Sequence, residues 1–303
     1  RQLPELHLAC SGLSVKAAKE EWKQLGLGKK NLTIALDWMH KEFSDAPVLG
    51  SLINPRKSNA ANIIAWDELS ETLTDALDQE SNKAHQSENE QKNLEATTVA
   101  QGLAKAATML ATQYHWVVTN VPYLARGKQD NTLKTFIEKH YPTGKNDLAT
   151  AFLDRCLEFC VEGGSTSVVL PQNWLFMASY KKFREKLLTQ ETWNIVARLG
   201  AGAFNTISGE VVKAILITLT RYNPEIDQPG LFEGDASAHH LRGVDLLDSM
   251  SASDKAEHLL NFEVKSVEQV KQLMNPDSRF MFTPLGFTKN LDVFSKVSGG
   301  LLV

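Results

Sequence analysis

The sequence predicts an α/β protein in which helices cover a largely parallel sheet. Beyond residue 112, short segments rich in Val and Ile alternate with segments that have apolar residues at helical spacing, and this alternation is typical of such sheets. The chain has 303 residues, 43% of them hydrophobic, which is enough for one large core with a smaller appendage. No apolar run approaches the roughly 18 residues that span a bilayer, and the first residues do not resemble a signal peptide. We therefore expect neither a membrane protein nor a secreted one.

The predicted strands and helices follow one another from residue 115 onward. The segment HWVVT at 115–119 is the first strand, and a helix over 147–161 follows it, with Asp147 as its N-cap. Gly163 and Gly164 end that helix. The remaining elements, in chain order, are a strand at 166–171, a helix at 179–190, and strands at 194–199 and 210–221. No helix separates the last two strands, so they should be antiparallel, and the sheet should have a reversed final strand.

An inserted helical segment is predicted before the first strand. Residues 67–112 are rich in Glu, Asn, Gln, Lys and Ala and contain no proline, a composition that favours helix. Two apolar stripes at helical spacing flank an almost wholly polar middle; they are Leu69, Leu73 and Leu77, and Leu103, Ala106, Ala107 and Leu110. We predict a helical pair with a solvated tip, inserted at about residues 56–112.

The charge distribution is uneven. The net charge is −4, which argues weakly against nucleic acid as a partner because Lys and Arg neutralise phosphates. Basic residues are nevertheless concentrated between Arg126 and Lys145, and again in a second cluster on a predicted helix; the second cluster is Lys181, Lys182, Arg184 and Lys186. A solvated helix face is the simplest interpretation of either cluster, and it is the preferred one for the second.

The cysteines and histidines do not suggest a metal site. Three cysteines, Cys10, Cys156 and Cys160, are too few for a disulfide framework and lack the spacing of zinc ligands, so a reducing cytoplasm is the simplest setting. Cys156 and Cys160 should be core residues. His239 and His240 have no second ligand pair at useful spacing and should lie in a surface loop.

The stretch NVPY at 120–123 ends the first predicted strand abruptly. Ligands of open parallel sheets bind beyond the carboxyl ends of the strands. Pro122 restrains Val121 to extended geometry, so the stretch offers the Asn120 side-chain oxygen and the Val121 carbonyl as acceptors beside the aromatic ring of Tyr123. A planar group with an exocyclic amine would fit these groups. On the residues alone, an ordinary turn explains the stretch equally well, since Asn and Pro are common turn residues.

Longer stretches resemble a known family of enzymes. HWVVTNVPYL resembles motif IV, usually Asn-Pro-Pro-Tyr, of amino-methyltransferases that use S-adenosylmethionine, and the segment from NDLATAF to REKLL resembles the helix, strand and helix that follow that motif. LGAGAFNTISGEVVKAILITLTR is similar to the closing hairpin that contains motif VIII. LHLACSGLSVKAAKEEW and DAPVLGSLINP resemble one branch, the large adenine-specific DNA methyltransferases of bacteriophage-exclusion (BREX or Pgl) defence systems.

The resemblance implies a Rossmann-like methyltransferase sheet that binds S-adenosylmethionine and acts on adenine flipped out of double-stranded DNA, together with other subunits of a defence system. Asn120, Val121, Pro122 and Tyr123 would form the catalytic motif, with Tyr123 stacked on the base. Ser51, Leu52 and Asn120 would contact the cofactor. Phe204 would cover the other face of the base or act as a hydrophobic plug, and Arg126 and Lys128 would meet the DNA backbone.

The sequence departs from the family pattern in two ways. Val121 occupies a position where proline is usual, and no cofactor loop of the Asp-Pro-x-x-Gly-Ser-Gly type is present. The chain begins with Arg1 rather than Met, so we expect that loop before Arg1 and a target-recognition domain after Val303. Residues 1–221 would then be the later part of the catalytic domain, and residues 222–303 a linker or connector toward the recognition domain.

Two competing hypotheses remain. Protein-glutamine and RNA methyltransferases also use an Asn-Pro-Pro-Tyr motif to bind a planar, amine-bearing group of their substrate. Alternatively, the fold persists without catalysis in a DNA-binding or assembly component, a hypothesis to which Val121 and the missing cofactor loop lend support. The long insertion favours the DNA methyltransferase over the smaller protein-modifying enzymes.

Overall fold

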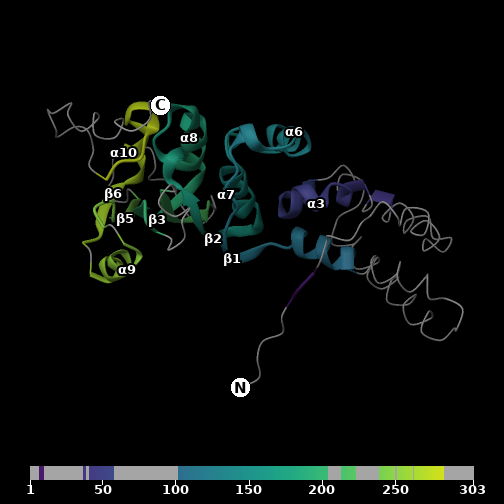
Figure 1. Cartoon of the computed structure of the whole chain (residues 1–303), viewed down its shortest axis with the longest axis horizontal. Helices are drawn as coiled ribbons and strands as arrows, with labels where there is room; N and C mark the ends of the chain where they lie inside the picture. Colours follow the sequence, from purple (N-terminus) through teal and green to yellow (C-terminus); the bar gives the residue numbers. More distant parts are fainter. Residues whose placement is uncertain are drawn as a thin grey trace, which may run out of the picture. The chain divides into compact units, whose positions relative to one another are not determined.

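The structure is a computed structural model that describes residues 7–9, 37–38, 41–57, 102–203, 213–222, 239–249, 251–261 and 263–282. The chain forms two compact units. The first comprises Arg1–Tyr114 and Gln129–Lys139, and the second comprises His115–Lys128 and His140–Val303. Figure 1 labels most of the helices and strands.

The second unit is built on a mixed sheet of six strands. The strands are β1 (Tyr114–Asn120), β2 (Cys160–Pro171), β3 (Glu191–Gly200), β4 (Ala214–Arg221), β5 (His240–Asp245) and β6 (Lys265–Glu268), and their order in the sheet is β1-β2-β4-β3-β5-β6. β4 pairs antiparallel with both β2 and β3, and the pairing with β3 agrees with the prediction. β5 runs parallel to β3, and β6 runs antiparallel to β5.

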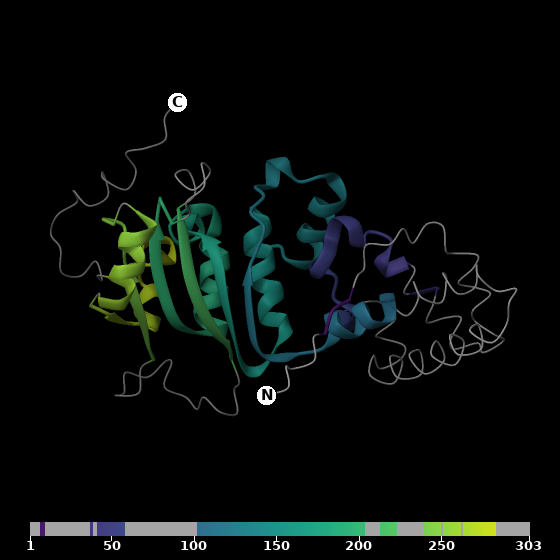
Figure 2. The ribbon, with the colours of Figure 1, turned by 60° about the horizontal axis from the view of Figure 1, so that its bottom comes forward.

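Two helices cover one face of this sheet (Figure 2). α7 (Leu148–Phe159) and α8 (Lys181–Gln190) contribute Leu153, Leu157, Phe183 and Leu187 to the same core as the sheet residues Val168, Val196 and Ile217. The short turns η5 (Gln172–Leu175) and η6 (Ala178–Tyr180) lead from β2 into α8. Burial of these apolar side chains provides most of the driving force for folding of the unit.

Large aromatic rings fill the centre of the core. Trp174 and Trp193 are almost fully buried, with ring centroids 5.6 Å apart. Phe280 stacks on Trp193 at 5.9 Å, and Phe282 meets Phe280 edge to face at 4.9 Å. Residues near position 280 are therefore part of the core of the second unit.

The sheet continues beyond Arg221, where the sequence placed the start of a linker. β5, α9 (Ala252–Asn261), β6 and α10 (Gln269–Leu273) follow, so β4 is not the last strand of the sheet. Gly243 of β5 allows a close approach: a Cβ atom there would lie 1.9 Å from Cε1 of Phe282. Within 222–303, the described residues from 239 to 282 thus fold with the sheet. The sequence did not reveal this, because short strands of four to six residues show little periodicity.

The helix α7 begins where the sequence predicted but ends earlier. Asp147 caps α7 as predicted, but α7 ends at Phe159, before Gly163 and Gly164, and β2 begins directly at Cys160. Gly163 lies within β2 with a φ of 73°. The glycines therefore lie inside a long strand instead of ending the helix.

Cys156 and Cys160 are buried free thiols, as predicted. Burial raises the pKa of Cys156 to about 12 and that of Cys160 to about 11, so both stay protonated and unreactive at neutral pH. Of the two histidines expected in a surface loop, His240 begins β5, and His239 lies 2.7 Å from the Trp193 carbonyl through Nε2. No three potential metal ligands among His, Cys, Asp and Glu gather within the described ranges.

One of the four residues of the second basic cluster is not on a solvated face. Arg184 is completely buried, and its guanidinium donates to the carbonyl oxygens of Trp174, Met177, Asp277 and Ser278. Lys186 forms an ion pair of 2.8 Å with the buried carboxylate of Asp154 on α7. The prediction of a solvated face is therefore wrong for Arg184, which serves as an internal clamp.

The first unit contains the described helix at 102–111, α3 (Ala46–Leu49), η2 (Gly50–Leu52), η3 (Pro55–Lys57) and α6 (Asn131–His140) up to Lys139. Of the predicted apolar stripe at 103–110, Leu103, Ala106 and Ala107 are buried, whereas Leu110 is half-buried. Residues 58–101, with the rest of the predicted helical pair, lie outside the described residues, so the pair stays a prediction. None of the described helices is long and apolar enough to cross a membrane.

Glu191, the first residue of β3, makes the stability of the second unit depend on pH. Its Oε2 accepts a hydrogen bond from the Tyr222 N–H at 3.2 Å. Burial raises the pKa of Glu191 from 4.5 to about 7, against the weaker effects of the Tyr222 N–H and of Lys186 and Arg221. Between these values the folded chain holds a proton that the unfolded chain releases, so the free energy of unfolding falls as the pH rises through this window.

Glu191→Gln should remove this pH dependence, because glutamine keeps the acceptor oxygen but does not titrate. Denaturant unfolding at about pH 5 and about pH 8 should show a smaller loss of stability for the variant than for the wild type. An equal loss in the two proteins would contradict the raised pKa of Glu191.

Candidate functional site

The site starts where β1 ends. Asn120 is the last residue of β1 and is exposed, whereas the Val121 side chain is 5% exposed and belongs to the core of the second unit. Pro122 is exposed, and Tyr123 is half-buried against the same core. The Asn120 side chain has no hydrogen-bond partner in the described part of the chain. Val121 thus anchors the loop to the core, and the neighbouring Asn120 side chain is exposed.

Val121 therefore has a structural role at the position where proline is usual. Its isopropyl group fixes the loop by burial, and Pro122 restricts the backbone beside it. Valine and proline each have a backbone carbonyl, so the departure from the usual motif does not remove an acceptor.

Hydrogen bonds tie the loop to the start of α7. The backbone N–H of Leu148 donates to the Leu124 carbonyl at 3.0 Å, and the Arg126 N–H donates to the Asn146 carbonyl at 3.0 Å. Asp147 Oδ1 accepts from the Leu124 N–H at 3.3 Å and from the Ala149 N–H at 2.9 Å. The second of these is the helix cap, so one carboxylate serves both the loop and the helix.

Tyr123 lies in the electrostatic field of Asp147. Burial raises the pKa of Tyr123, and the Asp147 charge raises it further. The same two causes raise the pKa of Tyr180 to about 12, against a hydrogen bond with Thr150. The pKa of Asp147 is itself raised by burial, while the Ala149 and Leu124 N–H groups lower it. Both phenols are therefore neutral at physiological pH, and Tyr123 offers an uncharged aromatic face.

Arg126 and Lys128 follow the loop in the turn η4 (Arg126–Lys128). Lys128 is exposed and Arg126 is half-buried. Asn120, Val121, Pro122, Tyr123 and these two basic residues all lie on one short segment of the second unit.

The other predicted site residues lie elsewhere. Ser51 and Leu52 belong to η2 in the first unit, where Ser51 is exposed and Leu52 is fully buried. The Leu52 side chain therefore serves the core of that unit, and contact with a ligand would have to use Ser51 or the backbone. Phe204 lies outside the described residues.

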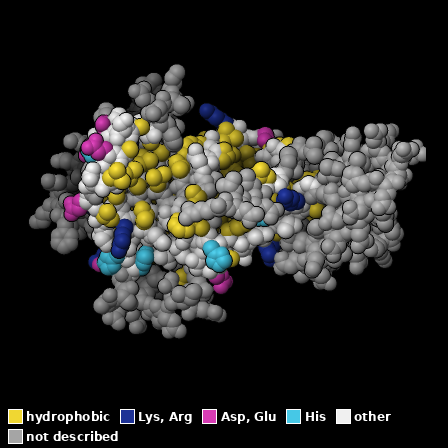
Figure 3. Space-filling model, turned by 90° about the horizontal axis from the view of Figure 1, so that it is seen from below, with side chains coloured by type: hydrophobic (Ala, Val, Ile, Leu, Met, Phe, Trp, Pro, Cys, Tyr) yellow, Lys and Arg dark blue, Asp and Glu magenta, His cyan; other side chains and the backbone are white. Residues whose placement is uncertain are grey.

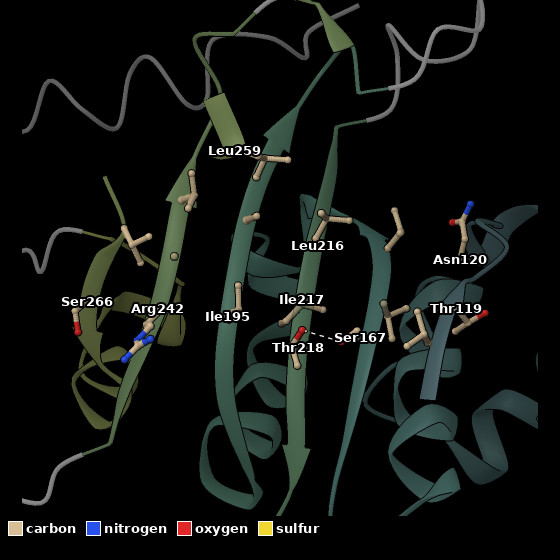
Figure 4. A pocket seen from close by; sticks show the side chains of 17 residues that line it. Thr119, Asn120, Ser167, Ile195, Leu216, Ile217, Thr218, Arg242, Leu259 and Ser266 are labelled. Atoms are coloured by element: carbon tan, nitrogen blue, oxygen red, sulfur yellow. Dashed lines mark hydrogen bonds between the residues drawn. The ribbon is translucent and has the colours of Figure 1, made fainter. Parts of the chain in front are cut away.

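A shallow, largely apolar hollow of about 1060 Å³ lies on the sheet face opposite α7 and α8, and Asn120 lines its edge. Figure 4 shows Ile195, Leu216 and Thr218 projecting from neighbouring strands, with Asn120 at the end of β1. Thr218 and Ser167 share a hydrogen bond of 2.9 Å on this face. Hydrophobic side chains also gather on the face seen in Figure 3, and the exposed ones in the second unit include Trp116, Val118 and Ile195.

Two residues near the loop, Asp147 and Tyr180, were not recognised from the sequence as its neighbours. Asp147 was recognised as a helix cap, but its bond to the Leu124 N–H was not, because a contact across 23 positions leaves no periodic signal in the sequence. Tyr180 was likewise seen only as part of a helix, although it lies within reach of the Asp147 charge.

Three comparisons place the chain among known proteins. It is 37% identical over 113 residues to adenine-specific methyltransferase PglX of Lacticaseibacillus casei (strain Zhang), covering 37% of this chain and 9% of that protein. It is 33% identical over 171 residues to adenine-specific methyltransferase BrxX of Escherichia coli O9:H4 (strain HS), covering 56% of this chain and 13% of that protein. The chain thus spans about a tenth of the length of these relatives.

Among solved structures, the chain is similar to a nuclease-deletion mutant of the Type ISP restriction-modification enzyme LlaGI in complex with a DNA substrate mimic. The TM-score is 0.43 at 12% identity, and the match covers 91% of this chain and 31% of that one. A sequence model of the family described as Eco57I restriction-modification methylase matches residues 15–204, more than half of the chain. The chain belongs to the Eco57I restriction-modification methylase family.

Proposed function

We propose that the chain is a catalytic segment of an adenine-specific DNA methyltransferase of a bacteriophage-exclusion defence system, at work in the cytoplasm. The enzyme transfers a methyl group from S-adenosylmethionine to the exocyclic amine of adenine in double-stranded DNA. The sheet of the second unit is then the later part of a Rossmann-like methyltransferase domain. The observation that supports this function most directly is the NVPY loop at the end of β1, with an exposed Asn120 beside an anchored Val121. Membership in a methylase family and the names of the two relatives agree with it.

The loop acts on the amine of the target base. That nitrogen is a weak nucleophile, because its lone pair is delocalised into the ring. The Asn120 amide oxygen and the Val121 carbonyl each accept one hydrogen of the amine, which returns electron density to the nitrogen and directs its lone pair out of the ring plane. The neutral ring of Tyr123 stacks on the base and holds it during this step.

The cofactor fits the groups that the chain presents. S-adenosylmethionine, when bound, supplies an electrophilic methyl group on a sulfonium centre. Asn120 is exposed and its side chain has no partner in the described ranges, so its amide can face both the cofactor and the base. Of the two η2 residues proposed for the cofactor, Ser51 is exposed and the Leu52 side chain is buried.

DNA meets the protein beside the loop. The target adenine must leave the duplex at a cost of a few kcal/mol, which stacking on Tyr123 and hydrogen bonds to the loop help to offset. Lys128 is exposed directly after the loop and, with Arg126, would contact backbone phosphates next to the flipped base. Other subunits of the defence system would share this assembly.

The substrate class can be tested directly. The full-length protein that contains this chain is incubated with its partner subunits, labelled S-adenosylmethionine and, in parallel, duplex DNA, RNA and a mixture of proteins. We expect label in DNA alone. Label in the RNA or protein fraction would show that RNA or protein is the substrate instead of DNA. Binding of the cofactor without methyl transfer to any of them would indicate an assembly component.

Substitutions of Tyr123 should distinguish the contribution of its ring to activity from that of its hydroxyl. The Tyr123 Oη has no hydrogen-bond partner within the described residues, so Tyr123→Phe should retain nearly full activity. Tyr123→Ala removes the stacking surface and should lower kcat/KM for DNA by about 5- to 150-fold, the equivalent of roughly 1–3 kcal/mol. Steady-state kinetics of methyl transfer tests both variants, and a Tyr123→Phe enzyme as poor as Tyr123→Ala would exclude simple stacking.

A further inference from the structure

We propose that Asp147 is a positioning residue for the loop of residues 120–123: its carboxylate fixes the loop to α7 so that Asn120 and the Val121 carbonyl stand where the amine is methylated. The proposal rests on the function proposed above and adds a residue to its machinery. Asp147 lies 23 positions after Leu124 in the chain and acts on the loop through the Leu124 N–H, not through contact with the substrate.

The Asp147 carboxylate holds the loop backbone from the α7 side. Oδ1 accepts from the Leu124 N–H at 3.3 Å, one residue after Tyr123. Backbone hydrogen bonds join residues 124–126 to residues 146–148, and Ala125 pairs with Asp147 as an isolated antiparallel bridge. The carboxylate therefore acts at the point where the loop leaves the site.

Hydrogen bonds also hold the turn at residues 144–150, which contains Asp147. The Thr150 hydroxyl donates to the Asp147 carbonyl at 2.8 Å and to the Gly144 carbonyl at 2.5 Å. Gly144 approaches this turn so closely that a Cβ atom there would lie 2.9 Å from the Thr150 carbonyl oxygen. The Asn146 side chain donates to the Ser179 carbonyl at 3.3 Å, just before α8. Because this turn is held in place, the Asp147 carboxylate can fix the position of the loop that it binds.

Position matters because the loop acts through geometry. A displacement of about 1 Å in a reacting group can cost roughly 100-fold in rate. The methyl-transfer step needs both acceptors of the loop in line with the amine, whereas DNA binding uses a much larger surface. Loss of the Asp147 contact should therefore lower the rate of the chemical step more than the affinity for DNA.

The chain offers a matched control for the helix cap. Asp130 caps α6 through an Oδ1 that accepts from the Leu133 N–H at 2.9 Å. Its role is thus local to α6, whereas the Asp147 carboxylate serves both α7 and Leu124. Asp130→Ala and Asp147→Ala each remove one helix cap, but only Asp147→Ala also releases the Leu124 N–H.

The experiment measures single-turnover methyl transfer to DNA by the full-length protein with its partner subunits. With cofactor and DNA saturating, Asp147→Ala should slow transfer by about 10- to 100-fold while the Kd for DNA changes by no more than about twofold. Asp147→Asn keeps an acceptor oxygen and should restore the rate to within about threefold of the wild type. Asp130→Ala should keep the wild-type rate despite a similar drop in Tm.

Several outcomes would overturn the proposal. Equal rates for Asp147→Ala and Asp130→Ala would reduce Asp147 to a helix cap. An Asp147→Asn enzyme as slow as Asp147→Ala would show that the hydrogen bond to the Leu124 N–H does not set the rate, because asparagine keeps both the cap and an acceptor oxygen. If Asp147→Ala does not fold, Asp147→Ser replaces it, because serine caps a helix but its side chain is too short to reach the Leu124 N–H as well. Absence of transfer by the wild-type protein would instead overturn the proposed function.

Discussion

Replacing Asn120 with alanine is expected to lower kcat for methyl transfer by about two to three orders of magnitude, the usual effect of removing one preorganised hydrogen-bonding group that acts in the transition state. The Asn120 side chain is exposed and makes no hydrogen bond within the described residues. Its removal therefore takes nothing from the core, and the variant should unfold at the wild-type temperature. The two measurements together separate a lost acceptor from a damaged fold.

Two further variants define the chemistry at this position. Asn120→Asp keeps an acceptor oxygen of the same reach and should retain more activity than Asn120→Ala. Asn261, at the exposed end of α9, provides the control, because its side chain donates to the Glu257 carbonyl in its own helix. An Asn120→Ala enzyme that transfers methyl groups as fast as Asn261→Ala would remove Asn120 from the mechanism.

Replacing Arg184 with methionine is expected to cost about 3–5 kcal/mol of the free energy of unfolding, because it removes one side of a buried charge-assisted network. Four carbonyl oxygens would lose their donor at once. Two of them belong to Asp277 and Ser278, which have left-handed φ angles of 54° and 52°. Such backbone strain persists only where the surroundings hold it, so the segment beyond α10 should detach first.

Denaturant unfolding of Arg184→Met and Lys182→Met tests this expectation. Lys182 lies on the same helix but is exposed, so the same substitution there should change stability by no more than about 0.5 kcal/mol. Arg184→Lys should recover little, because a single ammonium cannot reproduce the planar fork of the guanidinium. Equal stability of the Arg184 and Lys182 variants would mean that the internal clamp contributes nothing.

Local patterns predicted much of the second unit. The strand before Asn120, the N-cap at Asp147 and the helix that became α8 all follow from signals within a dozen residues. The antiparallel pairing of β3 with β4 was predicted because the sequence between them has no helical pattern. The candidate loop was found the same way, since a strand that ends in Asn, an apolar residue and Pro is visible in the sequence itself.

The parts that could not be predicted depend on contacts between distant residues. Arg184 was predicted to be solvated because it lies among Lys181, Lys182 and Lys186 in the sequence, whereas its four hydrogen-bond partners lie up to 94 positions away. The second bond of Asp147 and the approach of Phe282 to Gly243 are of the same kind. β5 and β6 were missed because they are short and gain their stability by pairing with the sheet.

The most direct test of the central claim is the identity of the methylated base. The full-length protein and its partner subunits are expressed in a host without adenine methylation, and the digested host DNA is examined by mass spectrometry. We expect N6-methyladenine with the wild-type protein and with Asn261→Ala, and none above background with Asn120→Ala. Methylated cytosine, or N6-methyladenine that persists in the Asn120→Ala strain, would contradict the assignment of this loop as the adenine-methylating site.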